Sequence, residues 1–245
     1  MDMRKLLYTS FVALALGASA CTVADVQRTM DGVLAGTGGL PVTRDEVAAG
    51  LKQALEVGIK SGSNQASQVD GYYGNPLLRI PFPEDVQRVE NTLRKVGLGN
   101  EVDKFILTLN RGAEDAARSA VPVFVDAIKQ MTIADAWAIL RGDDNAATEY
   151  LRRTTSQQLY DKFNPIIVNS LEKTNATRYY TDIVNQYNKI PLVQEVNPDL
   201  DDYATKKAID GLFVLIAQEE QNIRENPVAR TTDLLRRVFS QQDKS

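Results

Sequence analysis

The chain of 245 residues contains no histidine and a single cysteine, Cys21. Histidine is the commonest general base and neutral metal ligand, so its absence excludes nucleophile–histidine–carboxylate catalysis and histidine metal sites. One cysteine excludes an intramolecular disulfide and a zinc site built on thiolates. An enzyme of this sequence would have to use carboxylates, lysine, tyrosine, serine or threonine, and we predict neither a cofactor nor a metal.

The chain also lacks a strong excess of either charge. It has 28 Lys and Arg against 32 Asp and Glu, and the basic residues are scattered along the chain. This pattern gives no general attraction to a phosphate backbone, so we predict no nucleic-acid partner. A hydrophobic fraction of 43% with 24% charged residues is typical of a globular protein that is long enough to bury one sizeable core.

The apolar run near the start, 6–16, is too short to span a bilayer. Arg4 and Lys5 precede it and small residues follow it, which is the order of a secretory signal peptide. We therefore expect an exported protein, whether translation begins at Met1 or at Met3.

Two processing routes are compatible with the end of this signal. Ala18-Ser19-Ala20 suits an ordinary signal peptidase, whereas small residues directly before Cys21 resemble a bacterial lipobox, in which Cys21 is acylated. Lipidation would make a membrane the partner of the N-terminus. Thr22 stands where an aspartate commonly signals inner-membrane retention, so analogy with Gram-negative lipoproteins predicts the periplasm, at the outer membrane.

The rest of the chain divides into a tether and one domain. Residues 22–42 are rich in glycine, which is typical of a flexible connection. We predict a signal peptide over 1–20, a tether over 21–42 and a helical domain over 43–245. No composition shift and no repeat of fixed length marks a second domain.

Apolar residues beyond position 43 recur with helical spacing, and we find no alternation typical of strands. Capping boxes start helices at Thr43 and Thr132, and Asp199 caps a long helix that continues to about residue 225. Glycines and prolines over 61–83 indicate an ordered loop, with a short extended piece as one option. We predict an all-α fold, an irregular bundle of eight or nine helices.

Further boundaries follow from prolines and glycines. Pro83 opens a helix that stops at Gly97, and the first helix ends near Lys60. Asp143, Asp144 or Asn145 caps a helix that carries Tyr150. A separate helix starts at Thr154 or Thr155, with Pro165 forcing a kink or break near Asp161, and another spans 177–189.

The most unusual polar residue is Glu220, which falls between Ile216 and Ile223 on the apolar stripe of the long C-terminal helix. A carboxylate there is partly buried and needs a partner, for which Arg224, four residues on, is suitable. A structural ion pair is the favoured interpretation, and an acid in a pocket is the alternative.

A second candidate group lies on the helix around residue 110. Asn110 and Glu114 are one turn apart at the edge of its apolar face, and Arg118 follows one turn later. These side chains either form an interhelical hydrogen-bond network, which is favoured, or line a cleft together with Glu220. The candidate polar cluster is therefore Asn110, Glu114, Arg118, Glu220 and Arg224.

Two weaker patterns have an ordinary explanation beside the functional one. Asp199, Asp201 and Asp202 alternate like part of a calcium loop, and 143–145 is a second acidic turn, but both lack the glycine and distal glutamate of a full loop, so helix capping is favoured. Tyr72 and Tyr73, with 179–180, form either a platform for a sugar or apolar ligand or part of the core, which is favoured.

Ten short segments beyond position 79 carry a further signal: 80–83 (IPFP), 110–114 (NRGAE), 126–128 (DAI), 131–136 (MTIADA), 139–143 (ILRGD), 146–150 (AATEY), 200–203 (LDDY), 208–213 (AIDGLF), 220–224 (EQNIR) and 226–235 (NPVARTTDLL). Together they resemble a bacterial family known as domain of unknown function 4197, over about 44–240. The resemblance implies an exported helical protein and brings no established activity, cofactor or catalytic residue. One departure is Gly112, where the family pattern has alanine.

These observations favour a non-enzymatic binding or interaction domain of the bacterial envelope. Its expected partner is an envelope protein or an apolar ligand held between helices. The alternative is a carboxylate-dependent hydrolase of an envelope substrate, in which Glu114 and Glu220 supply the two acids that glycoside hydrolysis requires. The sequence sets no oligomeric state.

Overall fold

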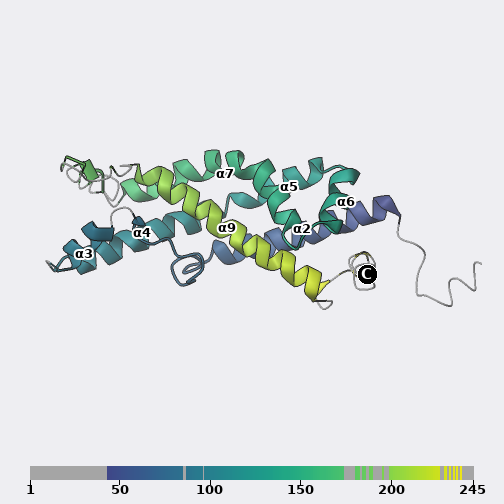
Figure 1. Ribbon diagram of the computed structural model, residues 1–245, viewed down its shortest axis with the longest axis horizontal. Coiled ribbons are helices and arrows are strands. Elements are labelled where there is room, and N and C mark those ends of the chain that lie inside the picture. The colour runs from purple at the N-terminus through teal and green to yellow at the C-terminus, as the bar shows by residue number, and fades with distance from the viewer. Residues whose placement is uncertain are drawn as a thin grey trace, which may run out of the picture. The chain divides into compact units, whose positions relative to one another are not determined.

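The computed structural model describes residues 43–84, 87–95, 97–173, 180–182, 184–185, 188–189, 195, 199–226, 229–230, 232, 234, 236 and 238. Within these ranges every regular element is a helix, which confirms the predicted all-α class (Figure 1). The predicted signal peptide, the tether, Cys21 and Tyr179 lie outside the described residues, as do 177–179, 183 and 186–187 of the helix predicted over 177–189. None of the described helices combines the length and the apolar character needed to cross a bilayer.

Seven helices have defined bounds. They are α2 (Arg44–Ala66), α3 (Gln87–Lys95), α4 (Gly99–Ala117), α5 (Ala120–Gln130), α6 (Ile133–Arg141), α7 (Ala146–Glu172) and α9 (Leu200–Glu225).

Helix α9 packs against three of the other helices. It contacts α7, α2 and α4, and Figure 1 shows it running obliquely past all three. Its apolar stripe places Leu212, Phe213 and Ile216 in the core. The Phe213 ring meets the Phe124 ring of α5 edge to face, with 5.7 Å between the ring centroids. Burial of these large side chains is the main force that holds the helices together.

Helix α7 corrects the prediction of two separate helices in this region, because it is continuous from Ala146 to Glu172 and includes Pro165. The hydroxyls of Thr154 and Thr155 do not cap a new helix. They donate to carbonyls one turn earlier, at Tyr150 and Leu151, within the same helix. Packing of fully buried apolar residues on both sides of Pro165 keeps the helix together despite the missing proline N–H.

Local boundary signals predicted most other helix ends. The capping boxes at Thr43 and Thr132 are both formed, and the Asp199 carboxylate accepts from the Asp202 N–H. Hydrogen bonds from Thr132 lower the pKa of Asp135 in its capping box. Gly97 follows the end of α3 and has a φ of +89°, a left-handed conformation that favours glycine.

Helix α2 is longer than predicted, and the loop is correspondingly shorter. The helix continues past Lys60 to Ala66, because its last turns still bury Ser63 and Ala66 against the core. The following segment, 67–83, contains turns and no strand among its described residues. The Tyr72 side chain of this loop is fully buried and anchors the loop to the core.

The Tyr72 ring lies against Gly211 of α9. A Cβ atom added at Gly211 would lie 2.8 Å from Tyr72 Cε1, so only glycine allows this approach. The Tyr72 hydroxyl donates to the Ala208 carbonyl over 2.6 Å, which prevents the ring from moving aside. Loop 67–83 is therefore locked onto α9 by one aromatic side chain.

We predict that Gly211→Ala lowers the free energy of unfolding by about 1–3 kcal/mol through overpacking, although alanine is the better helix former. Urea denaturation, monitored by circular dichroism, measures this change in the free energy of unfolding. The matched control is Gly62→Ala in α2, where the new Cβ would lie 3.4 Å from Leu215 Cβ, and we expect unchanged or slightly higher stability there. Equal stabilisation by both substitutions would show that Tyr72 is not locked.

Candidate functional site

Asn110 of α4 holds the backbone of loop 67–83 at Ile80. Its Oδ1 accepts from the Ile80 N–H over 2.8 Å, and its Nδ2 donates to the Ile80 carbonyl over 2.9 Å. Nδ2 also donates to the Ile106 carbonyl. The side chain is completely buried, so it satisfies loop groups that water cannot reach. Its role is to hold the loop rather than to bridge two helices.

Glu114, one turn later, holds the other side of the same loop. Its Oε1 accepts from the backbone N–H groups of Tyr72 and Tyr73 over 3.1 and 3.2 Å. Its Oε2 accepts from Arg111 over 2.6 Å, and Arg111 also binds Asp70 over 2.8 Å. The carboxylate is only 3% exposed, and all of its described partners are structural groups of this chain.

The third member expected on α4 does not join this group. The Arg118 guanidinium lies 3.4 Å from the Asp115 carboxylate and is largely exposed. Arg111, one turn before Glu114, takes the place that we expected for Arg118. Sequence reasoning missed Arg111 because both arginines lie about one turn from Glu114, and only the position of the loop decides which one is used.

Burial, together with the charge of Glu114, raises the pKa of the Tyr72 hydroxyl far above its ordinary value. The hydroxyl therefore stays protonated and serves as a hydrogen-bond donor to α9. The neighbouring Tyr73 ring is half-buried under the Arg79 guanidinium, 4.5 Å from the ring centroid. The core interpretation holds for Tyr72, whereas Tyr73 covers the loop at the surface.

Glu220 of α9 caps the N-terminus of α7. Its carboxylate accepts from the N–H groups of Ala147 and Thr148, over 3.0 and 2.8 Å, and from the Thr148 hydroxyl over 2.7 Å. The residue in the N-cap position, Asn145, makes no side-chain capping bond. The expected local cap is thus replaced by a carboxylate from a distant helix, placed where unsatisfied N–H groups and the helix dipole favour an anion.

The predicted pair of Glu220 and Arg224 is present. Arg224 Nη2 lies 2.8 Å from Glu220 Oε1 and donates as well to the carbonyl of Ile139, near the end of α6. A second arginine that sequence reasoning missed is Arg230, which is 2% exposed and donates to the carbonyls of Ile223 and Arg224 in the last turn of α9. The two arginines therefore satisfy carbonyls at the ends of α6 and α9.

We predict that Glu220→Ala lowers the free energy of unfolding by about 3–5 kcal/mol, because it leaves buried N–H groups and the Arg224 charge without their acceptor. Glu225→Ala is the control on the same helix. Glu225 is exposed and bonded only to Gln221 among its described contacts, so we expect a change of at most about 0.5 kcal/mol. Chemical denaturation measures both, and similar losses would contradict the capping role.

The five residues of the candidate polar cluster therefore separate. Asn110 and Glu114 bind the backbone of loop 67–83, and we call this pair the loop clamp. Glu220 and Arg224 lie at the start of α7, and Arg118 lies at the surface. Each buried carboxylate is surrounded by its own structural donors, and among the described contacts none joins Glu114 to Glu220.

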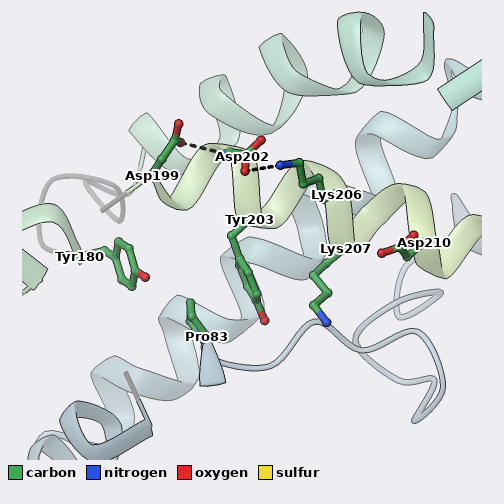
Figure 2. A pocket seen from close by; sticks show the side chains of 8 residues that line it. All are labelled: Pro83, Tyr180, Asp199, Asp202, Tyr203, Lys206, Lys207 and Asp210. Atoms are coloured by element: carbon green, nitrogen blue, oxygen red, sulfur yellow. Dashed lines mark hydrogen bonds and ion pairs between the residues drawn. The ribbon is translucent and has the colours of Figure 1, made fainter. Parts of the chain in front are cut away.

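A surface hollow of about 330 Å³ lies instead on the exposed face of α9, at the end where that helix begins (Figure 2). We call it the α9 hollow. It falls within the range of small-ligand sites. Its ring side chains come from three segments, Pro83, Tyr180 and Tyr203, and its charged side chains all come from α9 and its cap: Asp199, Asp202, Lys206, Lys207 and Asp210.

The rings of the α9 hollow are held in place. The Tyr203 hydroxyl donates to the Pro81 carbonyl over 3.2 Å. Tyr180 is 4% exposed and packs against Phe82 and Phe105, with centroid separations of 6.3 and 6.2 Å. Of the three tyrosines considered from sequence that the structure describes, Tyr180 lines this hollow, whereas Tyr72 and Tyr73 do not. Tyr203 was missed because it lies among the charged residues of α9.

Three of the charged groups of the α9 hollow, Asp202, Lys206 and Asp210, form ion pairs. Lys206 Nζ lies 2.8 Å from Asp202 Oδ2, and this hydrogen bond raises the pKa of Lys206. Asp210 binds Arg152 of α7 over 2.9 Å. Burial, and then the hydrogen bond to Asp202, raises the pKa of Tyr160, which donates to that carboxylate. Asp202 therefore accepts hydrogen bonds from both Lys206 and Tyr160.

Of the acidic residues at the start of α9, Asp199 caps that helix, as favoured. Asp199 Oδ1 accepts from the Asp202 N–H over 2.9 Å, and Asp202 binds Lys206 and Tyr160. Over the ranges that the structure describes, no group of three or more acidic or cysteine side chains is placed to hold a metal ion.

The fold and its buried contacts define an all-α domain in which the carboxylates of the core serve structure and the rings and charges of α9 form a surface hollow. A family model described as "Protein of unknown function (DUF4197)" matches residues 41–240, and the chain belongs to this family. The resemblance noted from the sequence is thereby confirmed. Comparisons with curated proteins and with solved structures gave no match.

Proposed function

We propose that this protein is a non-enzymatic binding protein of the bacterial envelope, which takes a small ligand in the α9 hollow. The observation that carries the proposal is the division between buried and exposed polar groups. Glu114 and Glu220 are 3% and 6% exposed and are occupied by donors of the chain itself, whereas Tyr203 and the charged groups of the α9 hollow are partly or fully exposed.

This division argues against the hydrolase alternative. A glycoside hydrolase needs two carboxyl groups that reach one substrate bond, and one of them must hold a proton. Glu114 and Glu220 each accept from three or more N–H or O–H groups and sit in separate networks. Carboxylates surrounded by donors in this way act as acceptors and have no room for a substrate.

The envelope part of the proposal rests on the first residues of the sequence. A basic start, a short apolar run and small residues before Cys21 favour export with lipidation of Cys21. Acyl chains contribute about 0.8 kcal/mol per buried methylene, which is enough for several chains to hold a domain at a membrane. The predicted destination is the periplasmic face of the outer membrane.

We predict that Cys21→Ser transfers the protein from the membrane fraction to the soluble periplasmic fraction and removes the mass of the acyl groups. Mass spectrometry of the mature protein and fractionation of cells measure the change, with globomycin, an inhibitor of the lipoprotein signal peptidase, as an independent block. An unchanged mass and an unchanged distribution would contradict lipidation while leaving export by the ordinary route.

Native mass spectrometry tests the binding function. The Cys21→Ser protein is purified from periplasm, and its native mass is compared with its denatured mass. We expect an additional mass that disappears on denaturation and that is lost or reduced in Tyr203→Ala, because this substitution removes a wall of the α9 hollow. Tyr73→Ala, on the loop, is the control that keeps the ligand. A bare polypeptide in every preparation would contradict a tightly held ligand.

A further inference from the structure

The ligand class of the α9 hollow follows from the balance of its charges. Its three aspartates are offset by Lys206 and Lys207 and by Arg152, which binds Asp210. An anionic ligand would meet three carboxylates, and a cationic ligand would meet two ammonium groups. Neither has a clear electrostatic advantage, so the hollow is suited to a ligand without net charge.

The polar groups favour a ligand that both donates and accepts. Asp210 is bound to Arg152 through Oδ1, and no hydrogen bond to its Oδ2 is found among the described residues, so Oδ2 can accept from a ligand. Lys207 has no carboxylate within ion-pair distance among the described residues, and its ammonium lies 5.9 Å from the Tyr203 ring centroid. Hydroxyl groups satisfy both, because each hydroxyl donates to a carboxylate and accepts from an ammonium.

The ring groups supply an apolar surface of suitable shape. Asp199, Tyr203, Lys207 and Asp210 follow one another at intervals of about one helical turn, so they share a face of α9. Figure 2 shows the Tyr203 and Lys207 side chains extending from this face toward the segment that carries Pro83. Because the Tyr203 hydroxyl is bound to Pro81, the ring loses little freedom when a ligand packs on it.

We propose that the α9 hollow binds a neutral oligosaccharide. The apolar C–H face of one sugar ring packs on Tyr203, and its hydroxyls bond to Asp210 and Lys207. This inference rests on the proposed binding function and names its ligand class. No bond is made or broken, so Asp210 and Lys207 are binding residues.

Saturation-transfer difference NMR and titration of the whole mature chain test the carbohydrate assignment. The neutral probes are N-acetylated chitotriose and cellotriose. The fully deacetylated glucosamine trimer is the cationic probe, and trigalacturonate is the anionic one. We expect a neutral trisaccharide to bind most tightly. Tighter binding of either charged trimer, or no saturation transfer to a neutral trimer at millimolar concentration, overturns the proposal.

Substitutions locate the site. Tyr203→Ala should weaken binding by about tenfold, the loss of one ring contact, while Tyr203→Phe keeps most of the affinity. Lys207→Ala should weaken binding by about three- to tenfold, and Lys104→Ala, at an exposed lysine of α4, should leave it unchanged. Lys207→Ala keeps the test valid if Tyr203→Ala fails to fold. Unchanged affinity in both hollow variants overturns the assignment.

The two proposals fail in distinguishable ways. If native mass spectrometry finds a ligand that depends on Tyr203 and no neutral sugar binds, the binding function stands and the carbohydrate assignment is wrong. If a neutral sugar binds and Tyr73→Ala rather than Tyr203→Ala removes the binding, the α9 hollow is the wrong site. If neither a retained ligand nor sugar binding is found, both proposals are wrong.

Discussion

A buried carboxylate, that of Glu220, fixes how three helices meet, and the rest of the described domain is arranged around them. Placed on α9, it completes the hydrogen bonds of the first turn of α7 and is neutralised by Arg224, which reaches the end of α6. A charge at 6% exposure is tolerated only when all of these partners are in place. The start of α7, the end of α6 and the last turns of α9 are thus specified together.

A second constraint comes from loop 67–83, whose backbone groups lack the regular partners of a helix or strand. Asn110 and Glu114 supply those partners from α4, and Tyr72 binds α9 beside Gly211. The loop clamp also affects the position of Tyr203 in the α9 hollow, because the end of this loop provides the Pro81 carbonyl that accepts from the Tyr203 hydroxyl. Core polar contacts therefore determine the shape of the α9 hollow without lining it.

This arrangement separates the buried acids, which stabilise the fold, from the charged groups of the surface hollow. The acids that most resemble catalytic groups in the sequence are hydrogen-bonded to groups of the chain itself. The charged residues of α9, which in the sequence resemble an ordinary solvated helix face, line a hollow together with two tyrosines. Gly112 lies where α4 approaches α7. A Cβ atom there would lie 3.3 Å from Ser170 Cβ, so the small residue permits a close helix contact.

The sequence by itself determined the all-α class, most helix ends and the burial of Glu220, since helical periodicity and capping depend on residues within about one turn of each other. It did not predict the continuity of α7. In that helix the Thr155 hydroxyl donates to a carbonyl one turn earlier, and the packing of buried side chains offsets the hydrogen bond lost at Pro165. Only the tertiary structure decided the partners of the buried acids. Glu220 caps Ala147 from 73 residues away and Glu114 binds Tyr72 from 42 residues away, and no local pattern specifies a hydrogen bond between segments so far apart.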